Sequence, residues 1–425
     1  MTTTDTHRAI EAVWRIESAK LIAGLARLVR DVGLAEELAQ DALVTALERW
    51  PESGVPERPG AWLMAAAKHR ALDLLRRRTM LARKHEELAR ELESLERTAP
   101  DFDAALDDPV GDDLLRLIFT ACHPVLSTEA RVALTLRLLG GLTTAEIARA
   151  FLTPEPTIAQ RIVRAKRTLS EARVPFEVPR GADLGARLSS VLEVVYLIFN
   201  EGYAATEGPD WVRPALCEEA LRLGRVLAEL APQEPEVHGL VALLEIQASR
   251  LRARVGPKGE AVLLLEQDRG RWDWLLVGRG LAALERAEAL GGEPGPYVLQ
   301  ASIAACHARA RRAEETDWAR IAALYGELAR VTPSPVVELN RAVAVAMAEG
   351  PAAGLEIADA LGSEPSLKTY HLLPAVRGDL LAKLGRVEEA RAEFERAAAL
   401  TRNEREREVL RGRAAACARE TSDGS

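Results

Sequence analysis

Residues 157–168 carry side chains of the types that recognise DNA, spaced so that a helix would bring them to one side. The polar side chains are Thr157, Gln160, Arg161, Arg164, Arg167 and Thr168. Four aliphatic residues are interspersed with them: Ile158, Ile162, Ala165 and Leu169. At 100° per residue, the aliphatic residues fall within roughly 40° of Ile158, and the polar ones between roughly 180° and 300°. Arginine can hold guanine through two hydrogen bonds, glutamine can read adenine, and threonine can contact phosphate or a thymine methyl. We therefore predict a helix that buries one face and offers the other to a major groove.

An ordinary amphipathic surface helix is the alternative explanation. Such helices usually mix acidic and basic side chains, whereas residues 157–170 contain no Asp or Glu. The capping box Thr143-Thr144-Ala145-Glu146 predicts a short helix upstream. Pro154 and Pro156 then predict a turn before a second helix from about Pro156 to Arg173. A helix-turn-helix is therefore the favoured interpretation.

A second basic segment runs from Lys68 to Lys84, with seven Lys or Arg and one acid, Asp73. On the helix predicted here, one face is apolar: Leu63, Ala67, Ala71 and Leu74. Another face is polar: His69, Arg70, Asp73, Arg76 and Arg77. Backbone phosphates are the first partners for such charges. A solvated basic surface remains the alternative.

Composition predicts the fold class and leaves the charge question to these segments. Ala, Leu, Arg and Glu dominate and aromatic residues make up only 4%, which favours an all-α protein. The net charge of −8 argues against nucleic acid as a partner of the whole surface. Two separate basic helices in an otherwise acidic chain therefore need a local explanation.

The chain divides into five predicted parts. Residues 8–97 are helical, with a break over 51–60, where three prolines and two glycines stop a helix. Residues 98–113 form a linker with six Asp and two Pro, too polar to fold alone. The remaining parts are a helical segment over 114–173, a helical extension over 182–290 and a repeat region over 297–418.

The repeat region is predicted from turns with related sequences. Glu349-Gly350-Pro351 and Leu384-Gly385-Arg386 place glycines 35 residues apart. That spacing is close to the 34-residue period of tetratricopeptide repeats, and residues 380–397 resemble one such repeat. A plain helical bundle is the alternative for the weaker units before it.

Other residues that could do chemistry lack the partners they would need. Glu266, Asp268, Trp272 and Asp273 have no third metal ligand at a sensible spacing. We expect a structural role for them, or a regulatory contact with the N-terminal domains through Asp268, Arg269, Trp272 and Asp273. We predict no metal, no cofactor and no enzymatic activity.

Cysteine and histidine residues are scattered in the same way. Cys122, Cys217, Cys306 and Cys417 have no metal-ligand spacing and are expected to be buried thiols in a reducing compartment. Cys122-His123 could begin a zinc site, but a helix end at Pro124 is favoured. Three isolated histidines are expected to be structural: His238, His307 and His371.

The polar N-terminus lacks the apolar core of a signal peptide. The most apolar run, residues 191–199, is interrupted by Glu193 and is too short to span a bilayer. We expect a cytoplasmic protein with no membrane partner.

Two DNA-binding candidates joined by an acidic linker resemble, over residues 8–175, an extracytoplasmic-function sigma factor of the sigma-70 family. The segments that match regions 2.2, 2.3 with 2.4, and 4.2 are, in order, 35–43, 59–77 and 144–166. The rest is similar to the subgroup whose sigma core is followed by a helical domain and tetratricopeptide repeats. Its matching segments are 119–124, 200–203, 267–273, 316–318 and 334–342.

The resemblance implies a role for each basic helix and for the helix before them. Core RNA polymerase would bind Glu37, Leu38, Gln40, Asp41 and Leu43. The −10 element, melted to a single strand, would contact Trp62, Lys68, His69, Arg70, Arg76 and Arg77. The −35 element would occupy the major groove facing Thr157, Gln160, Arg161, Arg164 and Arg167. The acidic linker would follow the basic polymerase channels where RNA later runs.

Three hypotheses of function follow. The first is a sigma factor with core polymerase and promoter DNA as partners, modulated by its extension, whose repeats would take a protein partner or a signal. The second is a one-component transcription factor that binds duplex DNA without polymerase. The third is a repeat scaffold with an incidental N-terminus, and an enzyme ranks below all three.

Overall fold

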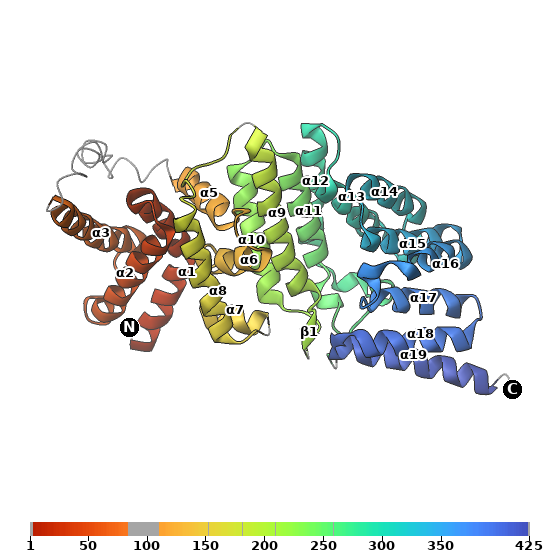
Figure 1. The fold of residues 1–425 in the computed structure, drawn as a ribbon. Helices are drawn as coiled ribbons and strands as arrows, with labels where there is room; N and C mark the ends of the chain where they lie inside the picture. Colours follow the sequence, from red (N-terminus) through yellow and green to blue (C-terminus); the bar gives the residue numbers. More distant parts are fainter. Residues whose placement is uncertain are drawn as a thin grey trace. The chain divides into compact units, whose positions relative to one another are not determined.

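The computed structural model describes residues 3–83, 110–151, 153–180, 182–208, 210–257 and 259–423 (Figure 1). The chain forms two compact units, Met1–Val195 and Tyr196–Ser425. Within the described ranges, the strands are limited to one parallel pair of two residues each, β1 (Glu207–Gly208) and β2 (Arg402–Asn403), plus one isolated bridge. The prediction of an all-α protein is confirmed.

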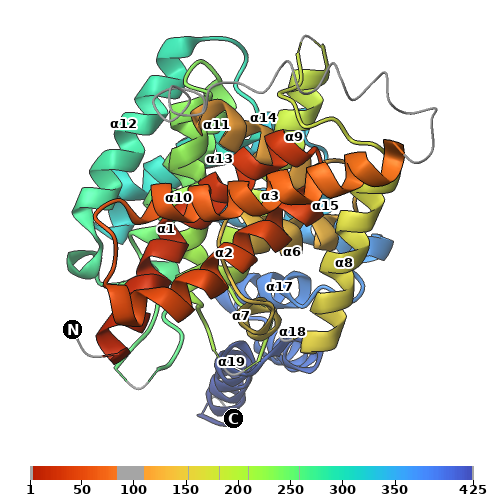
Figure 2. The ribbon, with the colours of Figure 1, turned by 90° about the vertical axis from the view of Figure 1, so that its left-hand side faces the viewer.

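The first unit begins with a three-helix bundle of α1 (Thr3–Val29), α2 (Val32–Ser53) and α3 (Pro59–Arg83) (Figure 2). Its core is built from residues one or two helical turns apart: Ile22, Leu25, Ala35, Ala39, Ala42, Trp50, Leu63 and Ala67. Asp31 caps α2, since its carboxylate accepts a hydrogen bond from the backbone N–H of Leu34 at 2.9 Å.

The predicted break over 51–60 was wrong at both edges. Helix α2 continues through Pro51 to Ser53, and α3 already begins at Pro59. A proline in the last turn removes only one hydrogen bond, and one at the first turn has no intrahelical bond to lose. The interruption is therefore short, and Gly54 makes the turn with a φ of 84°.

Among the described residues of the first unit, four shorter helices follow: α5 (Val110–Ala121), α6 (Thr128–Leu138), α7 (Thr144–Ala150) and α8 (Glu155–Glu171). Most of the predicted acidic linker, residues 98–109, lies outside the described residues. Its last four residues were predicted wrongly, because they form the first turn of α5. Asp113 is buried there and pairs with Arg27 and Arg116, so this acid serves packing within the unit.

The second unit takes in the end of α9 (Ala182–Tyr203), a helix whose first part belongs to the first unit. Its further α-helices are α10 (Pro214–Leu230), α11 (Pro235–Ala248), α12 (Trp274–Leu290), α13 (Pro296–Arg309), α14 (Trp318–Val331), α15 (Pro335–Glu349), α16 (Pro351–Ala360), α17 (Leu372–Lys383), α18 (Val387–Leu400) and α19 (Glu404–Asp423). Short 3-10 helices join them: η2 (Leu251–Ala253), η3 (Leu264–Glu266), η4 (Arg269–Arg271), η5 (Ala313–Glu315), η6 (Leu361–Ser363) and η7 (Pro365–Leu367).

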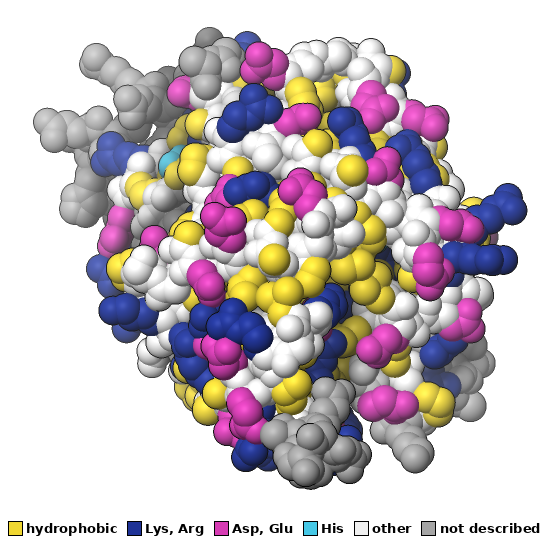
Figure 3. Space-filling view, turned by 90° about the vertical axis from the view of Figure 1, so that its right-hand side faces the viewer, with side chains coloured by type: hydrophobic (Ala, Val, Ile, Leu, Met, Phe, Trp, Pro, Cys, Tyr) yellow, Lys and Arg dark blue, Asp and Glu magenta, His cyan; other side chains and the backbone are white. Residues whose placement is uncertain are grey.

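Helices α14 to α19 follow one another as a stack in which sequential neighbours pack together (Figure 1). The two predicted glycine turns are confirmed: Gly350, with φ of 112°, joins α15 to α16, and Gly385, with φ of 73°, joins α17 to α18. The tetratricopeptide character of this stack stays a prediction. One face of the molecule carries interspersed acidic and basic side chains around a hydrophobic centre (Figure 3). Among the described helices, none has the length and apolar character that crossing a membrane requires.

Candidate nucleic-acid interface

The segment from Thr143 to Glu171 folds as a helix-turn-helix, and local chemistry explains its start. The Glu146 carboxylate accepts hydrogen bonds from the backbone N–H of Thr143 at 2.8 Å and from its hydroxyl at 2.9 Å. In return, the Thr143 hydroxyl accepts from the backbone N–H of Glu146 at 3.1 Å. This is the predicted capping box, which satisfies donors that a helix N-terminus leaves free.

Helix α8 buries the face predicted from its spacing. Its buried residues are Ile158, Ile162, Ala165 and Leu169, which pack against α6 and α7. On the opposite side Thr157, Gln160 and Arg164 are exposed, and Arg161 is half-buried. One side of α8 therefore offers polar side chains to solvent, as reading a major groove requires.

The three arginines of α8 differ in how free they are. Arg161 and Arg164 form no ion pair within the part of the chain that the structure describes. Arg161 lies near Glu129 and helps to lower the pKa of that carboxyl group. The larger causes of the lowered pKa are hydrogen bonds from the backbone of Glu129 and from Ser127. Arg167 contacts Glu171 at 2.6 Å, but its side chain remains 75% exposed. None of the three is packed into the interior.

The basic side of α3 is exposed as well. His69, Arg70, Arg76 and Arg77 reach solvent, whereas Trp62 and Lys68 are half-buried. Trp62 packs edge-on against the buried Trp50 of α2, with ring centroids 5.3 Å apart. Arg70 lies 3.5 Å from Asp41, and Arg76 lies 3.8 Å from Asp73, both as exposed pairs that solvent weakens.

The residues expected to bind polymerase divide between the surface and the core of the three-helix bundle. Glu37 and Asp41 are exposed and Leu43 is half-buried. Leu38 is only 3% exposed, and the side-chain amide of Gln40 donates to Glu36 at 2.6 Å. Leu38 and Gln40 therefore support α2 from within in this arrangement.

Sequence reasoning missed two exposed apolar side chains on α2. Val44 is 51% exposed and Leu47 is 39% exposed. They continue the stripe that begins with Glu37 and Asp41, since residues three or four apart share a helix face. A protein-binding face often combines apolar and polar side chains in this way. The signal available in the sequence was the helical spacing of these two apolar residues relative to Glu37 and Asp41.

Sequence reasoning also missed Glu36, a buried carboxylate that joins three helices. Glu36 is 3% exposed and accepts from the guanidinium Nε of Arg137 in α6 at 2.6 Å. Lys166 of α8 forms an ion pair with the other carboxylate oxygen. The carboxylate thus ties α2 to α6 and to the helix that presents the arginines.

The first part of α9 is anchored to the helices before it. Arg187 donates to the backbone carbonyl of Phe119 at 2.8 Å, and the hydroxyl of Ser190 donates to that of Cys122 at 2.6 Å. Arg131 of α6 also contacts Glu193 at 3.0 Å. The segment that begins at residue 182 is therefore part of the packing of the first unit.

The candidates of the second unit have structural partners there. Asp268 caps η4 by accepting from Gly270, and Asp273 caps α12 by accepting from Leu275 and Leu276. Arg269 and Trp272 are buried. A regulatory contact of these four residues stays a prediction.

The cysteines are free thiols, and Cys122, Cys217 and Cys417 are buried. Burial raises the pKa of Cys122 to about 11 and that of Cys217 to about 12, so neither is a thiolate at neutral pH. The described residues contain no group of three side chains suited to hold a metal ion. His123 instead accepts from the backbone N–H of Val125 at 3.1 Å, at the end of α5.

Comparisons with known proteins cover much of the chain. Residues 17–80 match sigma-70 region 2, residues 116–169 match sigma-70 region 4, and residues 187–288 match a family of unknown function, DUF6596. An uncharacterized protein of Rhizobium meliloti (strain 1021) is 45% identical over 392 residues, which is 92% of this chain and 91% of that protein. A probable ECF RNA polymerase sigma factor, SigI, of Mycobacterium tuberculosis (strain ATCC 25618 / H37Rv) is 27% identical over 178 residues, 40% of this chain and 58% of that protein. No solved structure matches the chain.

Proposed function

Because the chain belongs to the sigma-70 family, as a sigma factor of the extracytoplasmic-function type with a helical extension, we propose that it directs core RNA polymerase to −35 and −10 promoter elements. The observation that carries this proposal is the arrangement of α8. Its aliphatic face is buried, while Thr157, Gln160 and Arg164 are exposed and Arg161 is half-buried beside them. A helix of this kind, second in a helix-turn-helix, reads base edges with the residues of its exposed side.

The −10 element is assigned to the exposed side of α3. Its cations Arg70, Arg76 and Arg77 would neutralise phosphates of the melted strand, and His69 lies beside them on the same exposed side. Trp62 lies at the first turn of α3, where its partly exposed ring offers a surface on which an unpaired base can stack. Lys68 is half-buried beside them and belongs to the same proposed surface.

Core polymerase is assigned to the exposed stripe of α2. Glu37, Asp41 and Leu43 are the expected contacts that reach its surface, and Val44 and Leu47 add apolar area. Leu38 and Gln40 would act by holding the helix in shape. Burying two exposed aliphatic side chains is favourable in any protein partner that supplies a matching groove.

The extension is proposed to modulate activity through α9. Its first turns are hydrogen-bonded to the carbonyl groups of Phe119 and Cys122, at the end of α5. These contacts join α9 to the end of α5, within the unit that also contains α3 and α8. They also account for one segment that carries the family resemblance, residues 119–124, whose backbone receives α9.

Run-off transcription with core polymerase tests the proposed function. Genomic fragments of the source bacterium serve as templates, with core alone, core with the full chain, and core with an Arg161→Ala/Arg164→Ala chain. We expect start sites that require the full chain and that the double variant loses. A chain with Arg320→Ala serves as the control, because it removes an exposed arginine of α14 that lies outside the proposed DNA-binding surface. Transcription unchanged by the full chain would reject the proposal, and binding of promoter duplex without polymerase would favour the one-component transcription factor.

Modulation is tested with the full chain carrying Arg187→Ala and Ser190→Ala. Higher transcription than wild type would mean that the anchored α9 restrains the sigma domains, and lower transcription would mean that it supports them. Circular dichroism checks that both chains are equally helical. Identical transcription from the two chains would remove the role proposed for this anchor.

A further inference from the structure

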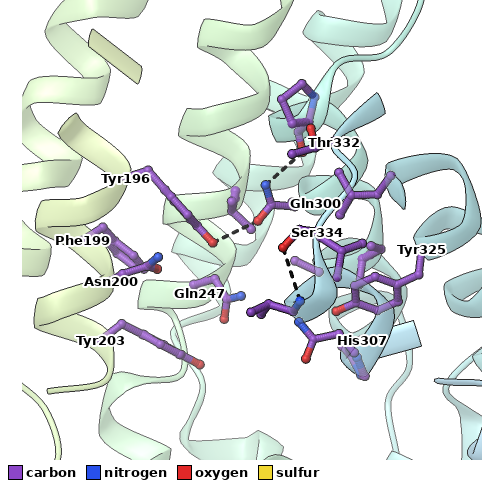
Figure 4. A pocket seen from close by; sticks show the side chains of 18 of the residues that line it. Tyr196, Phe199, Asn200, Tyr203, Gln247, Gln300, His307, Tyr325, Thr332 and Ser334 are labelled. Carbon is purple, nitrogen blue, oxygen red and sulfur yellow. Dashed lines mark hydrogen bonds between the residues drawn. The ribbon is translucent and has the colours of Figure 1, made fainter. Parts of the chain in front are cut away.

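A cavity of about 440 Å³ lies within the second unit and is lined by residues of α9, α11, α13, α14 and α15 (Figure 4). Its volume is within the range of small-molecule sites, about 300–1,000 Å³. Aromatic and aliphatic side chains form most of the wall, including Phe199, Leu243, Ile303 and Val336. The hydroxyl groups of Tyr203 and Tyr325 and the amide of Gln247 point toward its interior (Figure 4).

One charged side chain lines this cavity, and it has no counter-ion among the described residues. Arg250 follows α11 directly and is 3% exposed. Its Nε and Nη2 atoms are buried without a hydrogen-bond partner in the described part of the chain. Burial lowers the pKa of Arg250, the nearby charges of Arg254 and Arg269 act in the same direction, and only the hydroxyl of Tyr203 opposes them. The described residues that line the cavity include no carboxylate.

A neighbouring buried arginine, Arg269, has hydrogen-bond acceptors that Arg250 lacks within the described residues. Arg269 is 7% exposed and stacks on the same Trp272 ring as Arg250, at 5.0 Å and 5.1 Å from the ring centroid. Its guanidinium, however, donates to the carbonyl of His307 at 2.7 Å, to that of Ala310 and to the hydroxyl of Thr316 at 3.2 Å. Leaving a buried charge without such partners costs stability, so the state of Arg250 calls for another explanation.

Two further polar atoms of the wall are buried and unpartnered within the described residues: Oε1 of Gln247 and Nδ1 of His307. Burial, reinforced by the charges of Arg250 and Arg269, lowers the pKa of His307 to about 3, so its imidazole is neutral. Burial also raises the pKa of Tyr325 to about 12. The wall therefore offers one fixed positive charge, a free acceptor, and neutral groups that can donate or accept.

The segments that carry the family resemblance in the second unit meet around this cavity. Asn200 and Tyr203 come from one of them, and Ser334, Val336 and Asn340 from another. The segment 267–273 supplies Trp272, on which Arg250 stacks, and the segment 316–318 supplies Thr316, which fixes Arg269. The sigma function proposed above uses none of these residues.

We propose that this cavity is a binding site for a small organic anion with an apolar body. The carboxylate or phosphate group of the ligand pairs with the guanidinium of Arg250, because charge-assisted hydrogen bonds from a guanidinium match the geometry of these oxygens. The body of the ligand lies against the tyrosine and aliphatic side chains. A hydroxyl or amine group of the ligand donates to Gln247, the free acceptor of the wall.

Isothermal titration calorimetry on the full-length chain tests the site with three probes. They are 3-(4-hydroxyphenyl)propionate, phenyl phosphate, and the neutral 3-(4-hydroxyphenyl)propanamide. We expect at least one anion to bind, and the amide to bind at least about tenfold more weakly than the matched carboxylate. Preference for the first or the second anion identifies the ligand as a carboxylate or a phosphate ester.

Variants separate this site from general attraction of anions. Arg250→Met removes the charge at similar volume and should reduce anion affinity at least about tenfold, to the level of the amide. Gln247→Leu keeps the charge and should weaken the hydroxylated carboxylate about three- to tenfold. Arg320→Met changes the net charge by the same amount as Arg250→Met and should leave affinity unchanged.

The melting temperature decides between a ligand site and a structural arginine. The Arg250→Met chain should melt no lower than the wild type, because it loses an unpaired buried charge. The anion should raise the melting temperature of the wild type and leave that of Arg250→Met unchanged. Absence of binding by both anions, equal binding of carboxylate and amide, or retained binding in Arg250→Met would overturn the proposal. Polymerase and DNA are absent from these assays, so the outcome does not depend on the proposed sigma function.

Discussion

The arginines of α8 and the arginine at the cavity both lack a full set of protein partners, but the first are in contact with water and the second is buried in the protein. Arg164 is exposed, and water stabilises its charge at no cost to the fold. Arg250 is buried in a wall of aromatic and aliphatic side chains, where water cannot do the same. An unpaired guanidinium is therefore harmless to stability at the surface and costly in the interior.

The difference lies in the kind of anion that each group selects. An exposed guanidinium attracts weakly through screened charge, so useful affinity needs several of them and a polyanion such as DNA. A buried and uncompensated guanidinium gains much from one anion that fits, and little from one that does not. The α8 surface is suited to a long polymer, and the cavity to a single small molecule.

The largest expected effect is on promoter binding. Replacing Arg161, Arg164 and Arg167 by alanine should reduce the affinity of the holoenzyme for its promoter roughly 100-fold or more, because each base or phosphate contact contributes about 1–3 kcal/mol. Gel-shift titration of holoenzyme measures it, and anion binding at the cavity should not change. Wild-type affinity in the triple variant would show that the α8 arginines do not bind promoter DNA.

Stability distinguishes the two buried arginines next. Arg269→Met leaves the carbonyl groups of His307 and Ala310 without their donor and should lower the free energy of unfolding by about 3 kcal/mol or more. Arg250→Met should leave it unchanged or raise it, since an uncompensated buried charge is removed. Urea unfolding followed by circular dichroism measures both chains. Equal losses in the two variants would mean that Arg250 is as structural as Arg269.

Salt should separate the two regions by a smaller factor. Each α8 arginine that contacts a phosphate should add about 0.9 to the logarithmic salt slope, so the triple variant should show a slope smaller by up to about 2.7, which is up to roughly 40-fold for a fourfold rise in salt. Binding of the small anion at the cavity should change less than about threefold, because its partner is shielded from solvent ions. Parallel slopes at both sites would show that burial is not what distinguishes them.

Acid should destabilise the cavity through His307, the smallest of these effects. Its pKa is lowered to about 3 in the folded chain from 6.5, so the unfolded chain binds the extra proton between these pH values. The free energy of unfolding should therefore fall as the pH decreases through this window, by about 2 kcal/mol near pH 5. Urea unfolding of wild type and His307→Asn near pH 7.5 and pH 5 tests it, because the variant lacks this component. An identical pH dependence in both chains would contradict the assignment.

Local features of the first unit were predictable because they depend on neighbours in sequence. The spacing of Ile158 and Ile162 predicted the buried face of α8, and Thr143 with Glu146 predicted the capping box that begins α7. The end of α2 was misplaced because the last turn of a helix tolerates Pro51, which a count of prolines ignores.

Features that depend on distant contacts were not predictable. Glu36 is one of several acids on its helix, and only Arg137, a hundred residues away, and Lys166 distinguish it from Glu37. Arg250 belongs to a run with Arg252 and Arg254 that reads as a polar surface. Its neighbours include Tyr203 of α9 and Trp272, which are distant in sequence, so the local sequence gives no sign of its burial.

The carboxylate of Glu36 gives the first unit a latch. Moving α8 away from α2 would separate Lys166 from a buried carboxylate, which costs free energy because the buried charge loses one of its partners. The ion pair therefore stabilises the packing of α8 against α2. Under the proposed function, a promoter whose two elements require another position of α8 would have to supply the free energy that breaking this ion pair costs.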